Sequence, residues 1–193
     1  MQTDYRPRRH ASPTTLFACV LLASALTGTR MTWAQGSAQP GPGADLRRPA
    51  EVAQVLFGII SYVRWPVARP EVRLCLVGAV RHGAAIVDTP ASALGQRIRV
   101  KTIPPASAGS DCDVLYLGAL PDTERDALMT QVIGKPVLTV SEPGVACQVG
   151  TQFCLRLQEA QIGFEVNLDA IARSGLRVHP NALQIARRKG VQP

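Results

Sequence analysis

The stretch Ile162-Gly163-Phe164-Glu165-Val166-Asn167-Leu168-Asp169 predicts a strand that leads directly into a helix. Its first five residues alternate between apolar side chains and Gly163 or Glu165, which is the two-residue period of a half-buried strand. Asn167 stands where a helix would begin, because its side chain can accept a hydrogen bond from the free N–H groups of a first turn. Asp169 falls in that turn and complements the positive end of the helix dipole.

The residues that follow this stretch predict a second helix. Ser174-Gly175 marks the end of the first helix, since glycine readily adopts the left-handed conformation that closes it. Pro180 can occupy the first position of a short second helix, in which Leu183 and Ile185 are available for burial.

Upstream, short apolar segments alternate with helical patterns. An apolar helical stripe starts near Asp45 or Pro49 and ends at Trp65-Pro66, because a residue before proline avoids the helical conformation. We expect strands at 73–78, 97–103, 113–117 and 136–140, helices at 84–94 and 123–133, and an antiparallel hairpin of strands 153–158 and 161–166. This alternation predicts an α/β fold of three layers, with a mostly parallel sheet, an antiparallel end and helices on both faces.

Two of these elements also indicate which face they bury. The strand at 97–103 alternates basic and less polar residues, so its solvent-facing side chains should be Arg97, Arg99 and Lys101. The helix at 123–133 should bury Leu128, Val132 and Ile133.

Residues 1–34 are typical of a secretory signal. Arg6, Arg8 and Arg9 precede an apolar run at 16–26, and Thr32-Trp33-Ala34 offers a cleavage site. The run is shorter than the roughly 20 residues that a membrane-spanning helix needs. Cys19 lies inside the run and not after it, which disfavours a lipoprotein. We therefore expect an exported, periplasmic chain with a flexible linker at 35–48 and one α/β domain at 49–190.

The charge balance disfavours a nucleic-acid partner. The whole chain has a net charge of +7, but without residues 1–34 it has 17 basic and 13 acidic residues, a net charge of +4. Nucleic-acid binding favours a basic stripe interleaved with aromatic residues. Aromatic residues make up only 5% of this chain, so we expect no nucleic-acid binding.

Four cysteines remain once the leader is removed, and an even number in an exported chain favours two disulfides. Three pairings are possible. Cys147 and Cys154 are close in sequence and flank a turn with Gly150, so we expect them to pair, which leaves Cys75 to meet Cys112. The chain has no CxxC or HExxH motif, and we expect no bound metal.

The sequence contains no recognisable catalytic motif. It lacks a Walker loop, a GxSxG motif and a glycine cluster between a strand and a helix. Glu165 is expected to pair with an arginine across the sheet, and His82 to lie in a surface turn. We therefore expect neither catalytic residues nor a cofactor.

One group of residues does suggest binding. Arg177 and His179 flank Val178 in an extended link, so both side chains can point the same way, and the helix that starts at Pro180 favours an anion. Arg64 can add a third cation. The hypothesis is a site for a small anionic or nucleotide-like ligand, since arginine binds carboxylates and phosphates bidentately. The alternative is that Arg177 caps carbonyl groups and that His179 is merely solvated.

Several motifs together resemble the YfiR-like (DUF4154) family of bacterial periplasmic proteins. They are Tyr62-Val63-Arg64-Trp65-Pro66, Leu74-Cys75-Leu76-Val77-Gly78, Cys112 ahead of Val114-Leu115-Tyr116-Leu117, Leu138-Thr139-Val140-Ser141 with Gly144, and Phe164-Glu165-Val166-Asn167-Leu168. Members of this family carry cysteines at positions that match Cys75, Cys112, Cys147 and Cys154.

The resemblance implies a regulator and not an enzyme. Such proteins bind the periplasmic domain of an inner-membrane GGDEF diguanylate cyclase and hold it inactive, which lowers cyclic di-GMP. An outer-membrane lipoprotein can draw the repressor away, and the proteins form homodimers. All of these are expectations from the family.

Overall fold

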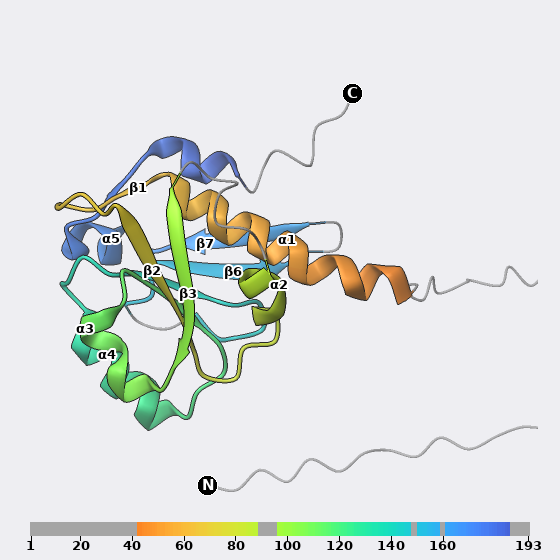
Figure 1. Ribbon diagram of the computed structural model, residues 1–193, viewed down its shortest axis with the longest axis horizontal. Coiled ribbons are helices and arrows are strands. Elements are labelled where there is room, and N and C mark those ends of the chain that lie inside the picture. Colours follow the sequence, from red (N-terminus) through yellow and green to blue (C-terminus); the bar gives the residue numbers. More distant parts are fainter. Residues whose placement is uncertain (1–41, 89–95, 148–149, 159–160, 186–193) are drawn as a thin grey trace, which may run out of the picture. The chain divides into compact units, whose positions relative to one another are not determined.

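The computed structural model describes residues 42–88, 96–147, 150–158 and 161–185 (Figure 1). The expected signal at 1–34 and the second half of the helix expected at 84–94 lie outside these residues. None of the helices in the described ranges is long and apolar enough to cross a membrane.

A six-stranded sheet forms the centre of the fold. Its strands are β2 (Glu71–Val77), β3 (Arg97–Ile103), β4 (Val114–Leu117), β5 (Leu138–Ser141), β6 (Phe153–Leu157) and β7 (Ile162–Val166). They lie in the order β3-β2-β4-β5-β6-β7, and every pair is parallel except β6–β7. The predicted α/β fold with a mostly parallel sheet and an antiparallel end is confirmed.

Helices cover both faces of this sheet and create two separate cores. On one face, α1 (Pro42–Ser61) and α2 (Gly83–Asp88) contribute Leu56, Ile60 and Ile86 to the larger core. On the other face, η2 (Pro105–Ser107), α3 (Ala108–Asp111) and α4 (Asp122–Val132) lie together, and Leu128 and Val132 belong to the smaller core. Figure 1 shows α1 and α4 on opposite sides of the strands. The buried strands are apolar on both faces because each face packs against helices.

The C-terminal stretch folds as its sequence predicts. Asn167 caps α5 (Leu168–Ser174), and its Oδ1 accepts a hydrogen bond from Ala170 N at 2.9 Å. Gly175 ends the helix with a φ of 73°. Pro180 opens η3 (Pro180–Gln184), which is a 3-10 helix. Glu165 pairs with Arg156 on β6, as expected: Nε and Nη2 each donate at 3.0 Å.

Some expectations about boundaries and faces were wrong. α1 begins at Pro42, because proline is tolerated in a first turn and Pro49 removes only one hydrogen bond from the helix. Ile133 is 49% exposed, and Met129 is buried in its place, because α4 ends at Val132. Leu183 is 45% exposed, because the 3-10 turn directs Ala182 to the core. On the edge strand β3, the alternation ends at the exposed Thr102.

Two disulfides join parts of this fold. Cys75 in β2 is bridged to Cys112, which comes just before the neighbouring strand β4, with the two Cα atoms 5.9 Å apart. Cys147 is bridged to Cys154 in β6, with a Cα–Cα distance of 5.5 Å. The first bridge is inside the smaller core, whereas Cys147 is exposed.

Candidate functional site

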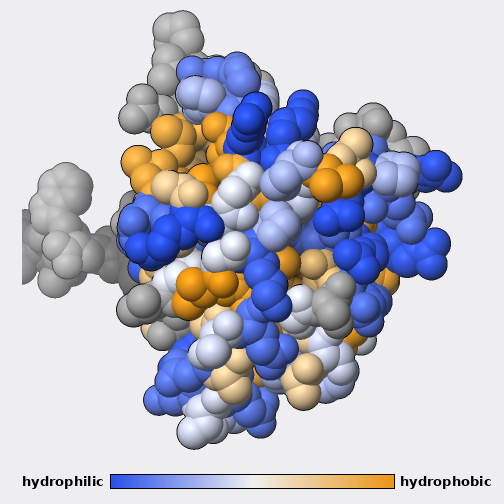
Figure 2. All heavy atoms as spheres, turned by 90° about the vertical axis from the view of Figure 1, so that its left-hand side faces the viewer, coloured by the Kyte–Doolittle hydropathy of each residue, from blue (hydrophilic) through white to orange (hydrophobic). Residues whose placement is uncertain are grey.

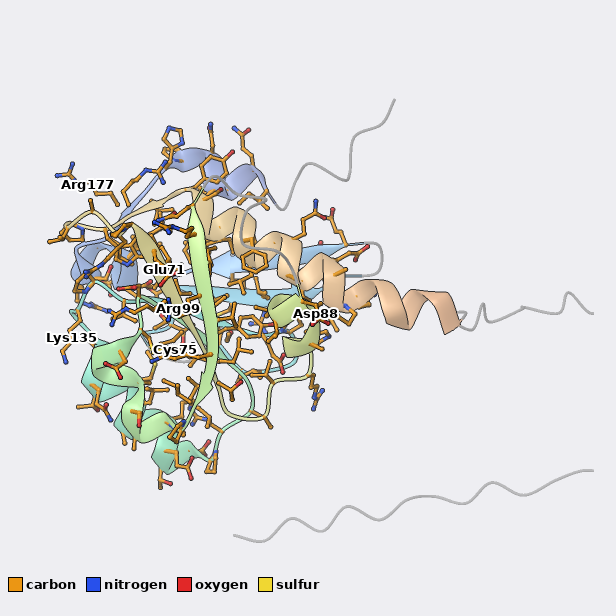
Figure 3. All side chains as sticks on the ribbon, in the orientation of Figure 1. Glu71, Cys75, Asp88, Arg99, Lys135 and Arg177 are labelled. Carbon is orange, nitrogen blue, oxygen red and sulfur yellow. A yellow bond between two sulfur atoms is a disulfide. The ribbon has the colours of Figure 1, made fainter. Side chains whose placement is uncertain are left out.

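The structure brings the three predicted site residues, Arg64, Arg177 and His179, to one small sheet. β1 (Val63–Arg64) pairs antiparallel with β8 (Arg177–Val178), and Arg64 lies directly opposite Arg177. His179 N donates to Tyr62 O at 3.0 Å, and the two rings stack with centroids 6.0 Å apart. In Figure 3 the Arg177 side chain extends away from the body of the molecule.

Two members of this trio already have local partners. Arg64 Nη1 donates to Ser61 O at 2.7 Å and to Val63 O at 2.9 Å, so Arg64 binds carbonyl groups at the end of α1. His179 Nδ1 accepts from Asn181 N at 3.2 Å and caps η3 itself. The side chain of Arg177 has neither a hydrogen bond nor an ion pair to a described residue. The alternative hypothesis was that Arg177 caps carbonyl groups. In the structure Arg64 does this instead.

A cavity of about 750 Å³ lies beside this small sheet, at the amino ends of β2 and β3. We call it the arginine cavity. It is lined by Ser61, Val63, Arg64, Trp65, Pro66, Ala68, Arg69, Pro70, Gln96 and Arg97. Three of these are arginines and none is acidic, so the arginine cavity favours an anion.

Asp113 holds one wall of the arginine cavity in place. Arg69 Nε lies 3.2 Å from Asp113 Oδ1, and Arg73 donates to the same carboxylate from Nε, Nη2 and its backbone N. Burial raises the pKa of Asp113, but the hydrogen bonds from Arg73 and the charges of both arginines outweigh it and lower the pKa below its ordinary value. The carboxylate therefore stays ionised and fixes Arg69.

The opposite end of the sheet is closed. Doubly wound sheets commonly bind ligands outside the carboxyl ends of their strands, where the strand order reverses. Here that point lies between β2 and β4, and the loops that follow these strands pair with each other. Ala79 and Ala119 exchange two backbone hydrogen bonds, at 2.9 and 3.1 Å. A Cβ on Gly118 would lie 2.4 Å from Ala79 O, so the two loops are in direct contact.

A buried carboxylate secures the same end. Glu142 follows β5 and is 1% exposed, and it accepts hydrogen bonds from the backbone N of Arg81 and of His82 at 2.9 to 3.2 Å. His82 Nδ1 lies 3.2 Å from the same carboxylate, so His82 is half-buried and not the surface turn residue that the sequence suggested. Burial, followed by the charge of Glu142, raises the pKa of Tyr116 on β4. These contacts stabilise the fold at the carboxyl ends of the strands.

Few features of the sequence indicate the arginine cavity. Arg69, Gln96 and Arg97 were not predicted as site residues, because they reach the cavity from a loop and from the start of a distant strand. The only local signal is the closeness of Arg64 and Arg69 in a proline-containing segment. Within the described ranges, no group of three or more His, Cys, Asp or Glu residues is placed to hold a metal ion.

Comparison with known families gives one match. A family model described as DUF4154, YfiR/HmsC-like, matches residues 50–187, which is most of the chain. The match includes every strand of both sheets and the whole lining of the arginine cavity.

Proposed function

Because the chain belongs to the YfiR/HmsC-like family, we propose that it is a periplasmic regulatory protein that represses a membrane-bound diguanylate cyclase. It binds the periplasmic sensor domain of the cyclase and so lowers cyclic di-GMP. The family is regulatory and not catalytic, which agrees with a chain whose buried charged residues serve the fold.

The proposed mechanism is a shift between two states of the partner. A regulator represses only if it binds the inactive state of the cyclase more tightly than the active state. An outer-membrane lipoprotein that competes for the regulator would relieve repression, and a homodimer would present two binding surfaces. Two disulfides suit the oxidising periplasm.

The test measures both binding and output. The purified chain, without residues 1–34, is titrated into the periplasmic domain of a membrane-bound GGDEF cyclase from the same genome. Deletion of the gene should raise cellular cyclic di-GMP, and this rise should require the cyclase. Absence of both binding and a cyclic di-GMP response would refute the proposal.

A second candidate function is binding of a small anionic or nucleotide-like ligand at Arg64, Arg177 and His179. The observation that favours it is the direct opposition of Arg64 and Arg177, since like charges opposite one another are destabilising and an anion would relieve this. Calorimetric titration with mononucleotides tests it. An unchanged isotherm in Arg177→Ala would exclude this site.

A further inference from the structure

We propose that the arginine cavity is where an acidic segment of the protein partner docks. This inference rests on the proposed function and adds to it the surface of contact and the chemistry of the partner. Four features support it: the local charge, the exposure of Arg97, the composition of the cavity, and the residues at its rim.

The local charge is positive and uncompensated. Arg69 and Arg73 share a single carboxylate, Asp113, while Arg64 and Arg97 have no acidic partner among the described residues. These five charged side chains have a net charge of +3. Glu71 lies opposite Arg97 in the strand register but pairs with Arg99 at 2.9 Å, so counting both Glu71 and Arg99 leaves the net charge at +3 (Figure 3). Such a surface attracts acidic groups and speeds their association.

Arg97 is the residue best placed to bind a partner. It is exposed at the start of the edge strand β3, and its side chain has no hydrogen bond or ion pair to a described residue. Arg69, in contrast, forms an ion pair with Asp113, with its Nε 3.2 Å from Oδ1. Arg97 and Arg69 together therefore offer two guanidinium groups that can bind carboxylates bidentately.

The lining fits a protein segment better than a small metabolite. Pockets for small molecules are lined mostly by apolar and aromatic side chains that enclose the ligand. Here Arg64, Pro66, Ala68, Pro70 and Arg97 are all exposed, so the cavity is broad and accessible. Figure 2 shows the side of the molecule that carries the β1–β2 loop, which is mostly hydrophilic with small separate apolar areas.

The rim also has features of a protein interface. Arginine and tryptophan are enriched where proteins meet. Val67, in the same loop, is 65% exposed and can be covered by an apolar residue of the partner. Trp65 lines the cavity, and its buried Nε1–H has no acceptor among the described residues.

The experiment compares two matched variants in titrations with the periplasmic domain of the cyclase. Arg97→Gln removes one positive charge from the cavity. Lys101→Gln removes one from the same strand, roughly 13 Å away, where Lys101 pairs only weakly with Asp111. Both side chains lie on the surface, so both variants should fold, which circular dichroism and thermal unfolding will verify.

We expect Arg97→Gln to weaken binding by about tenfold or more, and Lys101→Gln to change it by less than about twofold. The wild-type affinity should also fall steeply between 50 and 500 mM NaCl, and this dependence should be smaller in Arg97→Gln. Equal affinities for both variants, with wild-type binding intact, would overturn this inference and leave the proposed function standing. Absence of wild-type binding would overturn both.

Two further outcomes identify other occupants. If citrate binds the chain alone at micromolar concentration and Arg97→Gln abolishes that binding, the cavity is a small-molecule site and the proposal is wrong. If Arg97→Gln changes the sedimentation of the chain and not its affinity for the domain, the cavity is a contact between copies, and the proposal is equally wrong.

Discussion

Asp113 and Arg73 are joined by four hydrogen bonds across neighbouring strands, three of them to the Asp113 carboxylate, at 2.9 to 3.0 Å. Asp113 is 2% exposed and comes just before β4, while Arg73 lies on β2. The pair therefore holds together the amino ends of the two central strands, and with them one wall of the arginine cavity.

This contact makes stability depend on pH. The pKa of Asp113 in the folded chain is lower than its ordinary value of 3.8, so the stabilisation is complete above about pH 5 and is lost as the pH falls below about 4. We expect Asp113→Asn to lose about 1–3 kcal/mol at pH 7. The difference from the wild type should shrink between pH 4 and pH 2 in urea unfolding. A difference that stays constant with pH would contradict the ionic role.

The two disulfides should respond differently to reductant. Cys147 is exposed, whereas Cys75 and Cys112 are buried. Brief treatment with a phosphine should therefore free Cys147 and Cys154 first, as alkylation and mass spectrometry will show. Chain entropy predicts losses of about 2.5 kcal/mol for the short loop and about 4 kcal/mol for the long one. Simultaneous reduction of both bridges in the folded chain would contradict this order.

The closed end of the sheet predicts a contrast between two glycines. Gly118→Ala places a methyl group against the backbone of Ala79 and should destabilise the fold by about 3 kcal/mol. Gly134 has a φ of 77° but no atom within 4 Å of its added Cβ, so Gly134→Ala should cost only about 1–2 kcal/mol. Chemical unfolding at neutral pH measures both. Equal losses would mean that the loops separate easily.

Arg177 should contribute nothing to stability. It lies opposite Arg64 and binds no carboxylate among the described residues, so Arg177→Gln should leave stability unchanged or raise it by about 0.2–1 kcal/mol at low salt. This gain should vanish in 1 M NaCl. A loss above about 1 kcal/mol would indicate a structural contact.

The local signals in the sequence predicted much of this fold correctly. Asn167 and Gly175 delimit α5 because capping and left-handed closure depend on adjacent residues. The strands of the parallel sheet were also predicted correctly, because their apolar runs are local features of the sequence. Boundaries were less certain where competing signals were close, as at Pro42 and Pro49.

Contacts between distant segments were not predictable. β1 and β8 are two residues each and lie more than a hundred residues apart, so no periodicity marks their pairing. Glu142 stands in a Ser-Glu-Pro-Gly sequence that indicates an exposed turn, yet it is buried by a loop some sixty residues away. The arginine cavity was not predicted because its lining residues come from segments distant in sequence. Arg97 reaches it only through the register of β3.

The mutual pairing of Ala79 and Ala119 also limits how this scaffold could acquire new chemistry. Doubly wound sheets commonly bind ligands among the turns that follow their central strands. In this chain an insertion into these turns would first have to break a backbone bridge and expose Glu142. Length variation among relatives should therefore avoid the two loops that carry Ala79 and Ala119.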